Sequence, residues 1–142
     1  MPNSKAHPAH PLGVELMDDD HAELEALIGT VAVAADEDLA ALHEEIVQGL
    51  AAHFAREEEL MRQRGFPGLH CHNAQHKLLV DQARGGGAMT PAALRRHIGV
   101  HIAQLVESHV VTMDFMTAAF LRGEWGPQNF EGLRLPIEPS HA

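Results

Sequence analysis

The stretch LAALHEEIVQGLAAHFAREEELMRQRG, residues 39–65, decides the fold class of this chain. Its apolar residues recur at steps of three and four, as they do along one face of an α-helix. They are Leu39, Leu42, Ile46, Leu50 and Leu60. His53 and Glu57 lie near the same face, and Gly65 followed by Pro67 stops the helix. The stretch therefore predicts an amphipathic helix with two polar side chains on its buried side.

Three further helical patterns lie on either side of this one. Their predicted ranges are about 18–34, 69–83 and 91–122. The acidic cluster Asp18–Asp20 is suited to the N-cap of the first, and Asp36 is suited to cap the element after it. Thr90 at a cap and Pro91 at the first helical position open the last helix.

Four helical patterns with short connections and no strand pattern predict an all-α protein. The expected architecture is an antiparallel up-down-up-down four-helix bundle. We expect residues 1–142 to form a single domain, with the bundle over about 16–122, an irregular N-terminal arm and a tail over 123–142. Three prolines and Trp125, the only tryptophan, argue against a fifth helix in the tail.

Charge and composition exclude several classes of partner. The formal net charge of −10 argues against a surface that binds DNA or an anionic membrane. Every apolar run is interrupted before it reaches the length of a membrane span. The single Cys71 excludes an internal disulfide, and the first residues lack the apolar core of a signal peptide. We therefore expect a cytoplasmic protein.

Five imidazoles and two carboxylates recur on the predicted helices at spacings that suit metal ligation. They are His21, His53, Glu57, His72, His76, His109 and Asp114. Residues four apart on a helix lie about 6 Å apart along its axis, so His53 with Glu57, and His72 with His76, can each aim at one point. Nitrogen and oxygen donors without thiolate suit iron. The pattern predicts a metal site inside the bundle.

The remaining histidines and the cysteine are expected outside this site. His101 lies eight residues before His109, which is about 12 Å along one helix. By the same reasoning His43, His97 and His101 are assigned to the surface or to a satisfied core. His70 and Cys71 point away from His72 on a helix. The other histidines, His7, His10 and His141, fall in the irregular ends.

Asp114 and His109 do not fit a regular helix. Five residues separate them, so they lie about 140° out of phase. Because an acid among Met113 and Phe115 is costly unless it is paired or bound to metal, both side chains are expected at the same site. We predict a widened, π-type turn between them.

The motifs DDDH (18–21), HFAREEE (53–59), HNAQH (72–76) and HVVTMD (109–114), in this order and one per helix, resemble the bacterial hemerythrins. The lead-in PLGVELMDDDH and the stretch LMRQRGFPGLHCHNAQH extend the resemblance, which covers about residues 12–122. It implies two iron ions bridged by the carboxylates of Glu57 and Asp114 and by a solvent-derived oxo or hydroxo group.

The resemblance further implies two unequal irons. One would be saturated by His72, His76 and His109, while the other would have only His21 and His53 and keep a free position for reversible dioxygen binding. Candidates for an apolar lining of the dioxygen pocket are Leu24, Phe54, Leu105 and Val106. The expected function is that of a dioxygen carrier, store or sensor, without enzymatic activity and with any protein partner left open.

Three alternatives compete with this expectation. A di-iron enzyme that activates or reduces dioxygen, peroxide or nitric oxide is the first, although the only Glu-x-x-His spacing, Glu138 to His141, falls in the tail. The second is a structural zinc site, which usually has four ligands and is rich in cysteine. The third is a bundle without metal, in which the buried histidines and acids would have to satisfy one another.

Overall fold

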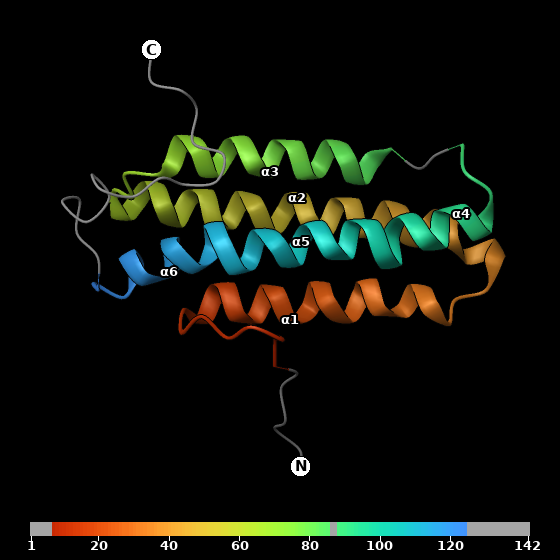
Figure 1. Cartoon of the computed structure of the whole chain (residues 1–142), viewed down its shortest axis with the longest axis horizontal. Helices are drawn as coiled ribbons and strands as arrows, with labels where there is room; N and C mark the ends of the chain where they lie inside the picture. Colours follow the sequence, from red (N-terminus) through yellow and green to blue (C-terminus); the bar gives the residue numbers. More distant parts are fainter. Residues whose placement is uncertain (1–6, 86–87, 125–142) are drawn as a thin grey trace.

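The computed structural model describes residues 7–85 and 88–124, and within these ranges all regular secondary structure is helical. Four rods make up the fold (Figure 1). The first three are α1 (Glu15–Gly29), α2 (Leu39–Arg64) and α3 (Leu69–Arg84). The last rod runs without a break through α4 (Pro91–Arg96), η3 (His97–Ile102), α5 (Ala103–His109), η4 (Val110–Asp114) and α6 (Phe115–Leu121).

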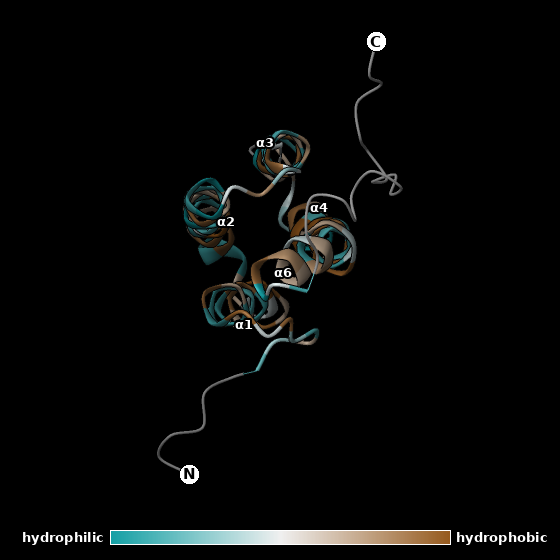
Figure 2. Cartoon of the chain, turned by 90° about the vertical axis from the view of Figure 1, so that its left-hand side faces the viewer, coloured by the Kyte–Doolittle hydropathy of each residue, from teal (hydrophilic) through white to brown (hydrophobic). Residues whose placement is uncertain are grey.

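The four rods lie side by side around a common centre (Figure 2). Two short 3₁₀ turns, η1 (Thr30–Ala32) and η2 (Asp36–Asp38), connect α1 to α2. The all-helical prediction is therefore confirmed for the described residues, with rods that form a four-helix bundle. The up-and-down order of the rods stays a prediction. None of the described helices is long and apolar enough to span a membrane.

The predicted bounds of the later helices agree with the structure. The second helix has the predicted ends, and Gly65 closes it in the left-handed conformation with φ of 68°. The third ends one residue later than predicted, at Arg84. Thr90 caps the last rod, because its hydroxyl oxygen accepts a hydrogen bond from the Ala93 backbone N–H at 3.2 Å.

The predicted caps of the earlier elements are wrong. The first helix begins at Glu15, with Val14 at the N-cap position. Asp18 instead accepts hydrogen bonds from the backbone N–H groups of Leu12 and Gly13, at 2.8 Å and 3.1 Å, and so ties the N-terminal arm to the helix. Asp36 lies within η2 and accepts a hydrogen bond from Arg95 at 2.6 Å in place of a cap.

Two apolar clusters fill the interior on either side of a polar layer. One is built around Leu50 and Ile98, and the other around Met17 and Val110. On α1, the buried His21 lies between Met17 of one cluster and Leu24 of the other. The rods thus hold a layer of polar side chains between two apolar clusters. Because these side chains are buried, bulk water cannot satisfy their hydrogen-bonding groups.

Candidate metal centre

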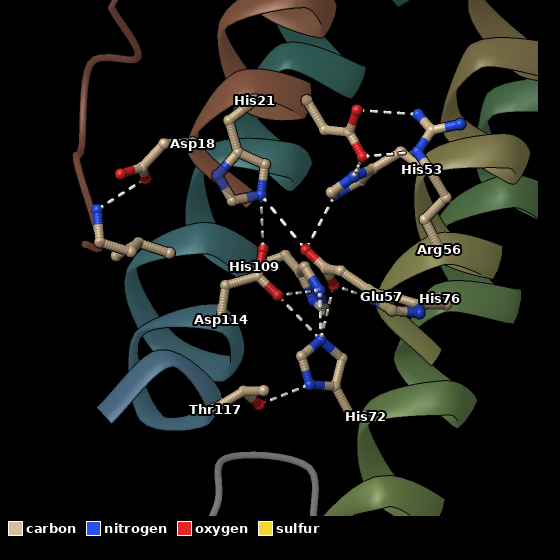
Figure 3. Close-up of polar contacts among 12 residues, drawn as sticks. Asp18, His21, His53, Arg56, Glu57, His72, His76, His109, Asp114 and Thr117 are labelled. Atoms are coloured by element: carbon tan, nitrogen blue, oxygen red, sulfur yellow. Dashed lines mark hydrogen bonds and ion pairs between the residues drawn. The ribbon is translucent and has the colours of Figure 1, made fainter. Parts of the chain in front are cut away.

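All seven predicted ligand residues lie together in the interior of the bundle (Figure 3). None of them is more than 3% exposed. They form two groups in which the nitrogen and oxygen atoms lie within 4.8 Å of one another. One group contains His72, His76 and His109, the other contains His21 and His53, and both contain Glu57 and Asp114.

Glu57 divides its two oxygens between the two groups. Its Oε2 atom lies 2.9 Å from His53 Nε2 and 3.4 Å from His21 Nε2. Its Oε1 atom lies 3.1 Å from His76 Nε2 and 3.4 Å from His72 Nε2. A carboxylate placed in this way has one oxygen available to each of two neighbouring cations.

Asp114 makes the same division from the last rod. Its Oδ2 atom lies 3.0 Å from His21 Nε2, while Oδ1 lies 2.8 Å from His72 Nε2 and 3.1 Å from His109 Nε2. The two carboxylates therefore span the same pair of positions from opposite rods. Their arrangement matches a pair of cations better than a single one.

Most of these polar atoms have no hydrogen bond in spite of their burial. The buried atoms without a hydrogen bond include both carboxylate oxygens of Glu57, both of Asp114, and the Nε2 atoms of His21 and His76. Each of these oxygens nevertheless lies within ion-pair distance of an imidazole Nε2 atom. A buried polar atom without a partner destabilises the fold by about 1–3 kcal/mol. One cation within each group would satisfy all of these atoms, so the donor set fits a pair of iron ions.

The widened turn in the last rod is confirmed. Residues Val110–Asp114 form the π-helical segment η4, directly after His109. The Thr112 hydroxyl donates a hydrogen bond to the Ser108 carbonyl oxygen at 2.7 Å and thereby competes with regular backbone bonding. The extra residue in this turn brings His109 Nε2 within 3.1 Å of Asp114 Oδ1.

A second layer of polar groups holds three of the imidazoles, and none of these contacts was predicted from the sequence. His53 Nδ1 donates to Asp20 Oδ2 at 2.9 Å, and Arg56 clamps the same carboxylate with two hydrogen bonds. Such partners orient a ligating imidazole and raise its basicity. The proximity of Asp20 and Arg56 to predicted ligands was the only signal in the sequence.

The other two partners come from α2 and α6. His76 Nδ1 donates to Glu58 Oε2 at 2.9 Å, so Glu58 does not belong to a purely solvated charge run. His72 Nδ1 lies 2.7 Å from the hydroxyl oxygen of Thr117. In each case the Nε2 atom is left to face the centre, as a metal ligand requires.

The carboxylates also control the protonation of the imidazoles. Burial by itself lowers the pKa of His21, but Asp114 and Glu57 outweigh it and raise that pKa to about 10. Burial likewise lowers the pKa of His53, whereas Asp20 and Glu57 raise it to about 9. The pKa of His72 is also raised to about 9, by Asp114 and Glu57 against burial. The carboxylates thus attract positive charge to the centre.

Glu57 shows the reverse of this effect. Burial tends to raise the pKa of its carboxyl group, but the surrounding imidazoles hold that pKa well below its ordinary value. The pKa of Asp114 is lowered too, by His109 and His21, although burial and the neighbouring Glu57 oppose this. Both carboxylates are therefore ionised at neutral pH and ready to bind cations.

The residues expected outside the site are not part of either group. His43 is buried and hydrogen-bonds the Ala83 carbonyl oxygen at 2.6 Å, as predicted for a satisfied core histidine. His70 and His101 are exposed, and His97 is half-buried. Cys71 is buried but contributes to neither group. Glu138 and His141 lie outside the described residues, as does most of the predicted tail.

The residues predicted to line the dioxygen pocket differ in their burial and in their contacts with the candidate ligands. Phe54 is buried, and its ring stacks on that of His76 with centroids 3.9 Å apart and planes 6° from parallel. It also meets the rings of His53 and His109 at 5.4 Å and 5.8 Å. Leu24 is buried in the core, whereas Leu105 and Val106 are half-buried. Their role as a dioxygen pocket stays a prediction.

Comparison with known proteins identifies the family. A family model described as "Hemerythrin HHE cation binding domain" matches residues 12–116. The chain therefore belongs to the hemerythrin family.

Among curated proteins, the chain is similar to "Bacteriohemerythrin" of Ralstonia nicotianae, with 30% identity over 113 residues. That match covers 78% of this chain and 82% of the relative. No solved structure matches the chain.

Proposed function

We propose that this protein binds dioxygen reversibly at a pair of iron ions held by the seven buried residues. The observation that carries the proposal is the division of each carboxylate: Glu57 and Asp114 both direct one oxygen to each group of imidazoles. Two carboxylates that bridge a pair of cations are what the bacteriohemerythrin resemblance requires. An antiparallel order of the four rods would bring all these donors to one depth.

The two groups would hold their ions unequally. With the same two carboxylates, one ion has three imidazoles, His72, His76 and His109, and the other has only His21 and His53. The ion with fewer imidazoles would thus be the one left accessible to dioxygen. When bound, the reduced iron pair would supply the two electrons that dioxygen takes up.

The protein itself orients the ligands and excludes water. Asp20, Glu58 and Thr117 fix three imidazole rings through their Nδ1 atoms. Phe54 covers His76 with its ring and keeps that side of the centre apolar. Since none of the candidate ligands is more than 3% exposed, water and anions have little direct access to the centre. These features favour reversible binding over continuous turnover.

The donor set also argues against the zinc alternative. Structural zinc sites usually have four ligands and several cysteines. Here, neither group contains a cysteine, and seven side chains converge. The metal-free alternative would leave the oxygens of Glu57 and Asp114 with imidazole ion pairs alone, since none of these buried oxygens has a hydrogen bond.

Metal analysis and absorption spectroscopy of the full chain test the proposal. We expect two irons per chain after reconstitution with Fe²⁺ under argon. Air should produce a visible absorption band, and removal of the gas should abolish that band over repeated cycles. Glu57→Gln should lose at least one iron, whereas Glu59→Gln, at an exposed position on the same helix, should retain both.

Two results would contradict the proposal. One zinc per chain with no affinity for iron would support a structural site. A band that bleaches irreversibly in air, together with sustained consumption of excess hydrogen peroxide, would instead support a di-iron enzyme.

A further inference from the structure

A surface groove runs between α1 and the last rod, separate from the candidate metal centre. Its volume is about 950 Å³, and none of the seven candidate ligands lines it. Ile28 and Val31 form one wall, while Val100, Ala103 and Val106 form the other. Figure 1 shows the two helical segments, α1 and α5, that flank it.

Small residues keep this groove open. A Cβ atom added at Gly29 would meet no atom within 4 Å, and one added at Gly99 would meet only Val31 Cγ1, at 4.0 Å. Val100 is left 50% exposed in the same groove. Apolar surface of this kind, open to solvent and concave, is typical of a ligand-binding site.

The α4 end of the groove has an unused cation. Arg95 is fully engaged, since it donates to the carbonyl oxygens of Val31 and Ala34 and to the carboxylate of Asp36. Arg96 lines the groove beside it, is exposed, and has no hydrogen bond or ion pair with any other described residue. Because the chain has a net charge of −10, most of its surface repels anions. The Arg96 guanidinium therefore provides a local site that can bind one anionic group.

The N-terminal arm closes the opposite end. The Ala9 backbone N–H donates to Glu25 at 2.9 Å, and His10 lies 2.9 Å from a carboxylate oxygen of Glu107. All four residues line the groove. A partner helix would have to run past this arm, and a second copy of the chain would bring another charge of −10. The groove therefore suits a ligand that ends within it.

Length and chemistry together define that ligand. Arg96 and Val110 line the groove fourteen residues apart, which corresponds to at most about 21 Å along the rod, because the π-helical segments within it rise less per residue than an α-helix. We propose that the groove binds one long-chain fatty acid, with its carboxylate at Arg96 and its alkyl chain along Val100, Ala103 and Val106. Burial of the chain supplies affinity, while the guanidinium sets its direction.

Palmitate titrated into the full chain by calorimetry, below its micelle-forming concentration, tests this proposal. We expect saturation at one palmitate per chain. Hexadecanol has the same chain length without the charge and should bind at least about tenfold more weakly. Titrations of the metal-free and the iron-loaded chain separate this result from the proposed function, because none of the seven candidate metal ligands lines the groove, which shares only Val106 with the predicted dioxygen pocket.

Two substitutions locate the ligand. Arg96→Glu should weaken palmitate binding by about tenfold or more, whereas Arg84→Glu, at an exposed arginine outside the groove, should not change it. Gly99→Leu should fill the groove and abolish binding. Circular dichroism and the melting temperature establish that each variant folds, and Ala103→Trp replaces Gly99→Leu if that variant does not.

Three results would overturn the proposal. They are uptake that does not saturate at one palmitate per chain, equal losses in Arg96→Glu and Arg84→Glu, and unchanged binding in a folded variant with a filled groove. Each would show adsorption of palmitate elsewhere on the surface.

Discussion

Asp20 and His53 form a buried hydrogen bond between the first two rods, with 2.9 Å between Asp20 Oδ2 and His53 Nδ1. Arg56 donates to both oxygens of the same carboxylate. The ionised state of Asp20 is favoured, because His53 and Arg56 lower its pKa against the effect of burial. A negatively charged group thus supports one of the only two imidazoles in the group with fewer ligands.

We predict that Asp20→Asn weakens iron binding in this group. The amide has no negative charge to support the His53 ring, so affinity should fall by about 10- to 100-fold. Competition with a chromophoric chelator measures this change. Asp19→Asn, at the exposed neighbouring residue, is the matched control and should bind iron like the parent chain. Equal affinities for Asp20→Asn and the parent would show that the hydrogen bond is only structural.

Glu58 should support the group with three imidazoles in the same way. Glu58→Ala removes the acceptor for His76 Nδ1 and should lower the affinity of this group for its iron by about tenfold. Glu59→Ala should have no such effect, since Glu59 pairs with Arg62 on the surface. The same chelator titration distinguishes the two variants, and a larger loss in Glu59→Ala would contradict the assignment.

The stability of the metal-free chain should depend on pH in both directions. Because folding raises the pKa of His21 to about 10 and that of His53 to about 9, their stabilising contribution is complete below the unfolded value of 6.5 and is lost as the pH rises through 9–10. Because folding lowers the pKa of Glu57 and Asp114, their contribution is lost as the pH falls below about 4.

Thermal denaturation at several pH values tests this dependence. The melting temperature of the metal-free chain should fall by roughly 5 °C or more between pH 7.5 and pH 10. In the iron-loaded chain, cations replace the protons, so the alkaline decrease should be much smaller. An unchanged melting temperature of the metal-free chain over this range would be inconsistent with the buried, charged imidazoles.

Deletion of Val111 tests the role of the π-helical turn. Val111 is 43% exposed and lies in the segment that separates His109 from Asp114. Without it, the two ligands would be four residues apart, about 40° out of phase on a regular helix. The variant should therefore still bind two irons, with a melting temperature close to that of the parent.

The matched control for this deletion is removal of Ala52, an exposed residue in the regular part of α2. That deletion rotates the two halves of α2 by about 100° relative to each other and should abolish iron binding. Loss of iron from the Val111 variant as severe as from the Ala52 variant would show that the wide turn itself is required.

Phe54 should protect the centre from solvent. Phe54→Ala removes the ring stacked on His76, and loss of a buried phenylalanine side chain destabilises a protein by about 3–5 kcal/mol. The fraction of iron-loaded chain that recovers its reduced spectrum after each cycle of air and argon should fall. Phe54→Leu keeps most of the apolar volume and should retain most of the recovery. Full recovery in folded Phe54→Ala would exclude this role.

The sequence by itself determined the rods and the faces that carry the donors. Within a helix, residues up to five apart are related by backbone geometry, so the spacings of His53 with Glu57 and of His72 with His76 predicted neighbours correctly. The same geometry showed that His109 and Asp114 needed a wide turn. The ends of α2 followed from its apolar period and from Gly65.

Only the tertiary structure decided which groups meet between rods. The pairs Asp20 with His53, Glu58 with His76 and Thr117 with His72 are separated by 33, 18 and 45 residues. Their contact depends on the rotation and relative height of two packed helices, which no local period contains. The same holds for the groove, because it exists only where small residues of α1 and the last rod face each other.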